Sequence, residues 1–133
     1  MRVLFTSTVL LALGIVVAGC GPQFAGKLSA AGGAVALKQE CVGFLRLYDQ
    51  TDGKKYAWMR RDSNYPPAIA SFGPQVVSIA SFEGVHVVDI QVSGGFSHHG
   101  LLVAGESFPA GFRPSRGSWT VWQLADGVWE YHE

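Results

Sequence analysis

The adjacent histidines His98 and His99 are residues of a type that can hold a metal ion. Neighbouring side chains on a strand point to opposite faces, so both rings could reach one ion only from a loop, with His86 or a carboxylate as a third ligand. Glycines on both sides of the pair favour such a loop. A solvated turn explains the same residues without an ion, and we expect no metal site and no cofactor. His86 alternates in register with Val88 and Ile90, which predicts a hydrogen-bonded core histidine.

The sequence holds no arrangement of nucleophile and base that is typical of an enzyme. The motifs H-E-x-x-H, C-x-x-C and G-x-S-x-G are absent. The acidic residues Asp49, Asp52 and Asp126 flank expected turns, where carboxylates usually accept backbone N–H bonds. Cys41 opens an expected strand, which favours a buried thiol over a disulfide between chains. We therefore predict that the protein is not an enzyme.

Cys20 is preceded by a segment with a pattern of its own. Arg2 supplies a positive charge, residues 3–17 are almost wholly apolar, and residues 17–20 read VAGC. Fifteen apolar residues are fewer than the roughly 20 that a membrane span needs, but they fit the apolar region of a signal peptide. This segment resembles the lipobox signal peptide of bacterial lipoproteins. The resemblance implies that Cys20 receives a diacylglyceryl group and becomes the first mature residue.

The lipobox also implies a location and a partner. Two or three acyl chains, palmitate among them, hold a protein stably on a bilayer, so the membrane is an expected partner through Cys20. Gly21 follows the cysteine where an aspartate would signal retention at the inner membrane. We expect a lipid-anchored protein of the cell envelope, in the outer membrane if the host is Gram-negative. The alternative is an ordinary signal peptide with a chance cysteine.

Composition narrows the remaining partners. Ten Lys and Arg residues balance ten Asp and Glu residues, so the formal net charge is zero. This balance argues against a nucleic-acid partner, which would need a basic surface. A hydrophobic content of 48% excludes a disordered chain, and two cysteines exclude a disulfide-dense scaffold. At 133 residues the chain has room for one domain.

The residues after Cys20 predict strands rather than helices. Residues 21–34 are rich in Gly and Ala and predict a flexible tether, with a first edge strand near Leu28 as the alternative. Beyond them the apolar pattern has a period of two, and Gly-containing turns separate the segments. The expected strands cover residues 42–49, 56–60, 75–82, 85–93, 101–104, 118–124 and 128–132, with hairpin turns at 51–54, 83–84 and 125–127.

These segments predict an all-β fold. We expect a single small antiparallel β-sandwich, jelly-roll-like, because one layer of sheet would leave many aromatic side chains in water. The predicted organisation is a signal peptide over residues 1–19, the lipidated cysteine and tether over 20–34, and the β-sandwich domain over 35–133.

One segment of this domain has a family resemblance. Residues 106–119 read ESFPAGFRPSRGSW, and the central part, residues 108–115, resembles a segment of the β-sandwich head domains of phage tail fibres and receptor-binding proteins. Those domains are binding modules and usually trimers, so the resemblance implies a binding role and a prophage origin, and leaves a homotrimer open. Tail fibres have no lipobox, so no partner is transferred from them. Arg113 in this segment can bind a carboxylate or a carbonyl oxygen.

The function expected from these observations is a non-enzymatic binding module for a glycan or an envelope protein. The candidate binding residues are Tyr56, Trp58, Tyr65, Arg113 and Trp129, because aromatic and arginine side chains are enriched in binding surfaces. A structural lipoprotein that oligomerises with itself is the main alternative. A hydrolase or metal-binding protein is the third, and it would require histidines and a carboxylate that converge in one pocket.

Overall fold

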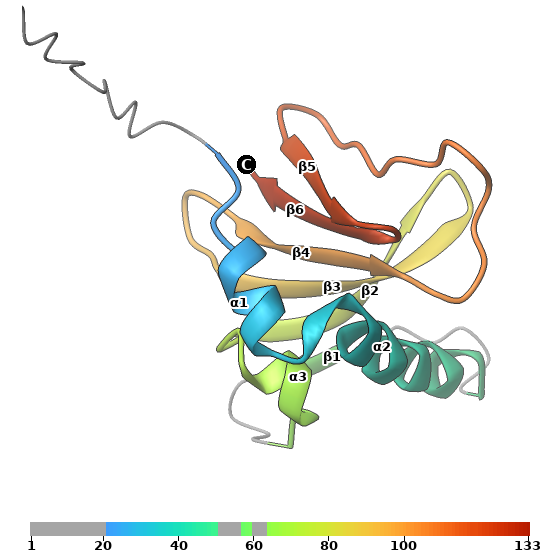
Figure 1. The fold of residues 1–133 in the computed structure, drawn as a ribbon. Helices are drawn as coiled ribbons and strands as arrows, with labels where there is room; N and C mark the ends of the chain where they lie inside the picture. Colours follow the sequence, from blue (N-terminus) through green and yellow to red (C-terminus); the bar gives the residue numbers. More distant parts are fainter. Residues whose placement is uncertain (1–20, 51–56, 60–63) are drawn as a thin grey trace, which may run out of the picture.

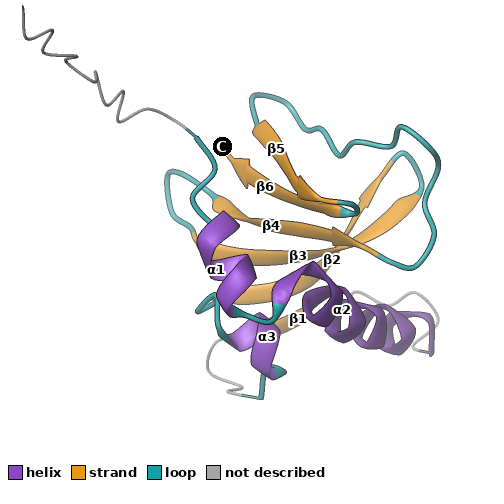
Figure 2. Cartoon of the chain, in the orientation of Figure 1, coloured by secondary structure: helices purple, strands orange, loops and turns teal. Residues whose placement is uncertain are grey.

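The computed structural model describes residues 21–50, 57–59 and 64–133. They form one open antiparallel sheet of six strands, with helices packed against one of its faces (Figures 1 and 2). The helices are α1 (Ala25–Ala30), α2 (Gly33–Gln50) and α3 (Pro67–Ala70). The strands are β1 (Ala57–Met59), β2 (Val76–Phe82), β3 (Val85–Ser93), β4 (His99–Ala104), β5 (Thr120–Ala125) and β6 (Val128–His132), in the spatial order β1-β2-β3-β4-β6-β5.

The predicted all-β sandwich is therefore wrong, and the fold is mixed α and β. Residues 42–49, predicted as a strand, lie inside α2. The side chains of Leu37, Cys41 and Phe44 follow at intervals of four and three residues and are all buried. This spacing places them on one face of a helix, which packs on the sheet. The alternation that suggested a strand covered only a few residues of the helix.

Residues 24–34 also differ from the flexible tether that was predicted. They form α1 and the beginning of α2, and Phe24 and Leu28 are buried in the same core as α2. The alternative of an edge strand near Leu28 is wrong for the same reason. The folded part of the chain thus begins about ten residues earlier than the predicted boundary at residue 35.

Two of the predicted hairpins are confirmed. Strands β2 and β3 pair across Glu83 and Gly84, whose φ angles of 50° and 81° are those of a tight hairpin turn. Strands β5 and β6 pair across Asp126 and Gly127. The short strand predicted at 101–104 is present as β4. The hairpin predicted between 42–49 and 56–60 is wrong, because β1 pairs with β2; its turn lies outside the described residues.

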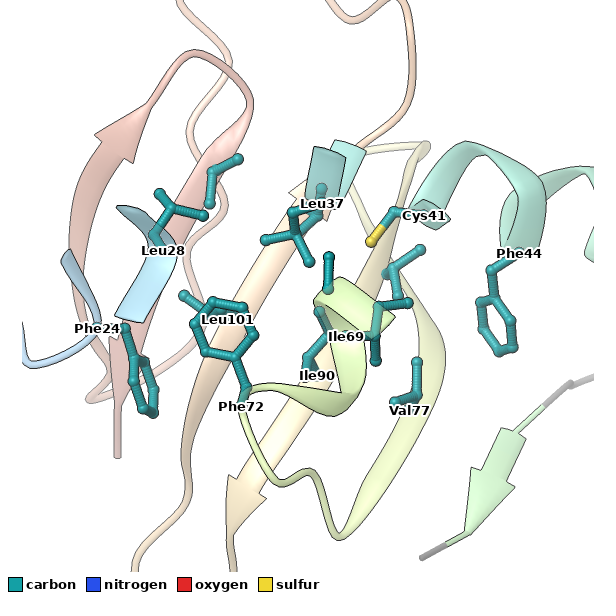
Figure 3. Close-up of a cluster of buried hydrophobic side chains, with 14 residues drawn as sticks. Phe24, Leu28, Leu37, Cys41, Phe44, Ile69, Phe72, Val77, Ile90 and Leu101 are labelled. Carbon is teal, nitrogen blue, oxygen red and sulfur yellow. The ribbon is translucent and has the colours of Figure 1, made fainter. Parts of the chain in front are cut away.

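The sheet buries apolar side chains on both faces, but a second sheet covers neither. One face carries the helices, and its core joins α1, α2 and α3 to the sheet, as Figure 3 shows. The other face is covered by residues 105–119, an irregular segment. From it, Phe108 and Phe112 contact Trp129 at centroid distances of 5.7 and 5.6 Å, and Trp119 stacks on Tyr131 at 4.2 Å. The segment that resembles tail-fibre domains is thus a cover for the sheet and no part of a sandwich.

Among the described helices, none has both the length and the hydrophobicity that crossing a bilayer requires. The longest, α2, carries its apolar side chains mainly on the face toward the sheet, with Leu37 and Phe44 buried and Gln39 and Arg46 exposed. The segment that resembles a lipobox signal peptide, residues 1–20, lies outside the described part of the chain.

Candidate functional site

Glu130 is the only charged residue that is buried in the described part of the chain. It lies in β6, where the side chains alternate between the two faces of the sheet. Trp129 and Tyr131 point into the core under residues 105–119, so Glu130 points to the face that carries α1. A buried carboxylate is costly unless it is hydrogen-bonded, and its partners therefore define a site.

Two of these partners are backbone N–H groups from the beginning of the described chain. The N–H of Gln23 donates to Oε1 and Oε2 of Glu130 at 2.7 and 2.8 Å, and the N–H of Phe24 donates to Oε2 at 2.9 Å. These residues precede α1, whose first N–H groups have no partner within the helix. The carboxylate therefore holds the N-terminal segment against the last strand.

Two histidines complete the surroundings of this carboxylate. His99 in β4 lies directly opposite His132 in β6 in the register of the sheet. Their Nε2 atoms lie 2.9 and 3.0 Å from Oε1 of Glu130. Phe24 stacks on the ring of His99 at 4.4 Å and 11°, and Trp122 meets His132 edge-on at 5.0 Å. We call His99, Glu130 and His132 the β4–β6 cluster.

The hydrogen bonds of Glu130 decide its charge state. Burial raises the pKa of this carboxyl group, but the N–H groups of Gln23 and Phe24 and the two imidazoles together hold the pKa below its usual value. Glu130 is therefore an ionised acceptor despite its burial. An anionic oxygen next to two imidazole nitrogens is a donor set for a transition-metal ion, and the three ligand atoms lie within 4.8 Å of one another.

The structure separates the histidines that the sequence suggested as a group. His98 does not join His99 but bonds through Nδ1 to the carboxylate of Glu133. His86 lies near the opposite end of β3, where it is exposed and contacts Tyr48 at a centroid distance of 5.1 Å. The prediction of a core histidine at position 86 is wrong. His86 and His98 do not converge in one pocket.

A groove at the other end of the sheet is the second candidate site. It lies between α2, the β2–β3 turn and residues 105–109, and its volume is about 620 Å³. Arg46 and Glu106 form an ion pair at 3.4 Å across its rim. We call it the α2 groove; its lining combines charged and apolar side chains, among them Val42, Leu45, Arg46, Asp49, Glu83 and Glu106.

Of the predicted binding residues, those that the structure describes do not form one surface. Trp58 is half-buried and packs on Phe44 at 4.6 Å, and the hydroxyl of Tyr65 donates to the carbonyl of Trp58 at 3.0 Å. Trp129 is buried on the opposite face of the sheet. Arg113 does bind a carbonyl oxygen, that of Val121. Tyr56 and Cys20 lie outside the described residues.

Cys41 is fully buried in the core under α2, as expected for a structural thiol. Burial raises the pKa of the thiol far above its usual value, and the nearby Glu40 carboxylate raises it further. The thiolate, which is the reactive form, is therefore suppressed at neutral pH. Cys41 also belongs neither to the lining of the α2 groove nor to the β4–β6 cluster.

Sequence reasoning missed Glu130 and His132. The available signal was the pattern E-x-H at residues 130–132, which puts a carboxylate and an imidazole on the same face of a strand. This pattern does not show which strands pair, and His99 comes opposite His132 only in the register of β4 with β6.

Comparisons of the chain with protein-family models, with curated proteins and with solved structures found no match. The resemblance of residues 108–115 to tail-fibre head domains therefore stays a prediction.

Proposed function

We propose that this chain is a lipid-anchored envelope lipoprotein whose domain binds, without catalysis, a segment of another envelope protein in the α2 groove. The lipobox residues 17–20 support the anchor, and the open groove with its mixed lining supports the binding role. The proposal keeps the lipid anchor and the binding module that the sequence predicts and replaces the sandwich with the observed fold.

The observation that carries the proposal is that the Glu130 end of the sheet, where the described chain begins, lies opposite the α2 groove. Cys20 comes three residues before Gln23, which is held by Glu130. Three residues span at most about 10 Å, so a lipidated Cys20 places the Glu130 end of the domain next to the bilayer. Strand β3 runs from the groove at His86 to Ser93 beside β4, a rise of roughly 23 Å. The groove would therefore face the aqueous side.

The lining of the α2 groove suits a polypeptide better than a glycan. Arg46 and Asp49 supply both signs of charge next to the apolar side chains of Val42 and Leu45. An extended peptide offers the same mixture of charged, polar and apolar groups. The aromatic ring of Phe108 in the lining is half-buried and packs on Trp129, so it is not exposed as a flat platform for a sugar.

A self-assembling lipoprotein is the second candidate, and one observation favours it. Strand β5 ends the sheet, and in the described part of the chain no strand pairs with its outer side. Such an edge can pair with the same edge of a second copy. Thr120 is exposed on this strand and marks the edge for a test.

The binding role is tested by site-specific photo-crosslinking in intact envelopes. The full chain is expressed with its own signal peptide and carries the photoreactive residue at position 49 in the groove or at position 120 on β5. The proposal expects one envelope protein crosslinked from position 49, absent from position 120, and lost when Arg46→Glu reverses the charge of the groove. Crosslinks from position 120 to a second copy alone would support self-assembly instead. Products that are the same from both positions would refute the groove.

The anchor is tested separately by labelling cells with radioactive palmitate. The full chain should take up label and fractionate with membranes, and Cys20→Ser should abolish both. Cys41→Ser is the matched control, because it removes the other cysteine and should leave the label in place. Label that survives Cys20→Ser would refute the lipid anchor while leaving the groove experiment unaffected.

A further inference from the structure

We propose that His99, Glu130 and His132 form a binding site for one divalent transition-metal ion of the Zn²⁺ type. The site lies where the N-terminal segment meets the sheet, and it is independent of the α2 groove. The ligands would be Nε2 of both histidines and Oε1 of Glu130. Two imidazoles and a carboxylate are a ligand set that Zn²⁺ accepts.

The first argument is the rigidity of the arrangement. His99 and His132 are cross-strand partners on neighbouring strands, and Glu130 lies two residues from His132 on the same face of β6. All three side chains therefore leave the sheet in the same direction. Phe24 stacks on His99 and Trp122 contacts His132, so these aromatic neighbours restrict the rotation of both imidazole rings. A ligand set that is organised before binding loses little conformational freedom when the ion arrives.

The second argument is the crowding at one oxygen. Oε1 of Glu130 lies within hydrogen-bond distance of three nitrogens: the backbone N of Gln23 at 2.7 Å, Nε2 of His99 at 2.9 Å and Nε2 of His132 at 3.0 Å. A carboxylate oxygen has two lone-pair directions in its plane, and the Gln23 N–H, shared with Oε2, takes one of them. The two imidazole nitrogens converge on the remaining direction, where an ion between Oε1 and the two Nε2 atoms can contact all three. Oε1 then binds one cation and one N–H.

The third argument is charge. The ring centroids of His99 and His132 are 3.8 Å apart. Glu130 supplies a negative charge beside both rings, and an imidazole ligates a metal through the lone pair of a ring nitrogen. A divalent cation at this point is therefore attracted by the carboxylate and within reach of both Nε2 atoms. The side chains of His99 and His132 are 15% and 26% exposed, so an ion can enter from solvent and keep a water as fourth ligand.

The carboxylate also keeps its structural role when the ion is bound. Oε2 of Glu130 still accepts the N–H groups of Gln23 and Phe24. These bonds then act as second-shell contacts that orient a metal ligand. The proposal therefore predicts that metal binding and the fastening of the N-terminal segment stabilise each other.

The test is Zn²⁺ titration by calorimetry on the full lipidated chain, purified in detergent and stripped with a chelator. One ion should bind per chain, and Co²⁺ in its place should give the visible bands of a tetrahedral site. His132→Gln keeps an N–H donor toward Glu130 but removes the imidazole, so it should weaken binding at least about tenfold. His86→Gln and His98→Gln are matched controls that should bind as the wild type does. No saturable binding, or equal affinity in the His132→Gln and His98→Gln variants, would overturn the proposal.

A second measurement needs no variant and covers the case in which His132→Gln fails to fold. X-ray absorption spectra of the Zn²⁺-loaded wild-type chain should show nitrogen and oxygen neighbours with the outer-shell scattering of two imidazole rings. A sulfur shell, or a spectrum without imidazole scattering, would show that the ion binds elsewhere and would also overturn the proposal.

Discussion

The backbone N–H of Gln23 donates to both carboxylate oxygens of Glu130, at 2.7 and 2.8 Å, although 107 residues separate the two in the sequence. The N–H of Phe24 adds a bond of 2.9 Å to the same side chain. The beginning of the described chain is thereby fastened to its last strand. The position of α1 on the sheet therefore depends on the carboxylate of Glu130 in β6 as well as on the buried apolar side chains of the helix.

Glu130→Gln should therefore destabilise the protein by about 3 kcal/mol, because bonds to a buried charged acceptor are worth more than neutral ones. The amide that replaces one oxygen would also present N–H donors to the N–H groups of Gln23 or Phe24. Urea unfolding followed by circular dichroism measures the change in the free energy of unfolding. Glu106→Gln is the matched control, since the exposed pair with Arg46 should contribute less than about 1 kcal/mol. Equal effects of the two variants would contradict the role assigned to Glu130.

The β2–β3 and β5–β6 hairpins could be predicted from the sequence because their signals are local. Glu83-Gly84 and Asp126-Gly127 are turn sequences between apolar runs of even spacing, and both turns are found where they were expected. Each hairpin depends on residues within two neighbouring segments of the chain. Cys41 is also buried as predicted, but on the sheet-facing side of α2 and not at the beginning of a strand.

Helix α2 was missed because the same residues carry both periodicities. Phe44, Arg46 and Tyr48 alternate with leucines over a short stretch, which is typical of a strand. Leu37, Cys41 and Phe44 also follow a helical spacing, and this longer pattern decided the structure. A helix of 18 residues buries more apolar surface against this sheet than a short edge strand could. Local alternation was overridden by packing.

Gly43→Ala tests this assignment directly. Gly43 is exposed in the middle of α2, and a Cβ there meets no atom within 4 Å. In a helix the alanine should stabilise the protein by about 0.5–1 kcal/mol, because glycine is the poorer helix former. Thermal unfolding should show a higher midpoint with no loss of helical signal. A lower midpoint would indicate that residues 42–49 are not helical.

The β4–β6 cluster could not be predicted because it depends on strand order. His99, Glu130 and His132 come from two strands that are neighbours in space but are separated in the sequence by β5. Because β5 lies between β4 and β6 in the sequence, the sequence alone does not indicate that β6 pairs with β4. The sequence suggested His98 as the partner of His99, because the two are adjacent. In the structure His98 bonds to Glu133 instead.

The buried carboxyl group of Asp89 should make the free energy of unfolding depend on pH, and the sign of this dependence can be stated. Tyr131 donates to its carboxylate at 2.7 Å, but burial raises the pKa of Asp89 above its usual value. A raised pKa in the folded state means that Asp89 favours folding most below its unfolded pKa, and that this contribution is lost as pH rises through the folded pKa. Asp89→Asn should remove this loss and be at least as stable as the wild type at pH 7.

The measurement is the free energy of unfolding from pH 4 to pH 7 for the wild type and Asp89→Asn. The difference between them should shift in favour of the variant as pH rises. Asp126→Asn is the control, because Asp126 is exposed in a turn and should show no such trend. A variant that becomes relatively less stable toward pH 7 would reverse the sign and contradict the burial argument.

Gly100, the one glycine within the described strands, should be hard to replace. It pairs with Gln91 in β3 and Tyr131 in β6, and a Cβ at this position would lie 2.3 Å from the carbonyl oxygen of Ile90 and 2.9 Å from the hydroxyl of Tyr131. A backbone carbonyl in the middle of a sheet has little room to move. Gly100→Ala should therefore cost about 3 kcal/mol, opposite in sign to the effect of Gly43→Ala.

The double variant Gly100→Ala with Tyr131→Phe separates the two contacts. Removing the hydroxyl relieves the contact at 2.9 Å but leaves the one with the Ile90 carbonyl at 2.3 Å. Tyr131→Phe also removes the hydrogen bond to Asp89, so its own cost must be measured in the single variant. If the carbonyl dominates, as its shorter distance and rigid backbone imply, the costs of Gly100→Ala and Tyr131→Phe should simply add in the double variant. Chemical unfolding of the two single variants and the double variant gives the coupling between the sites. A favourable coupling as large as the cost of Gly100→Ala would show that the side chain, and not the strand β3 backbone, excludes a Cβ at position 100.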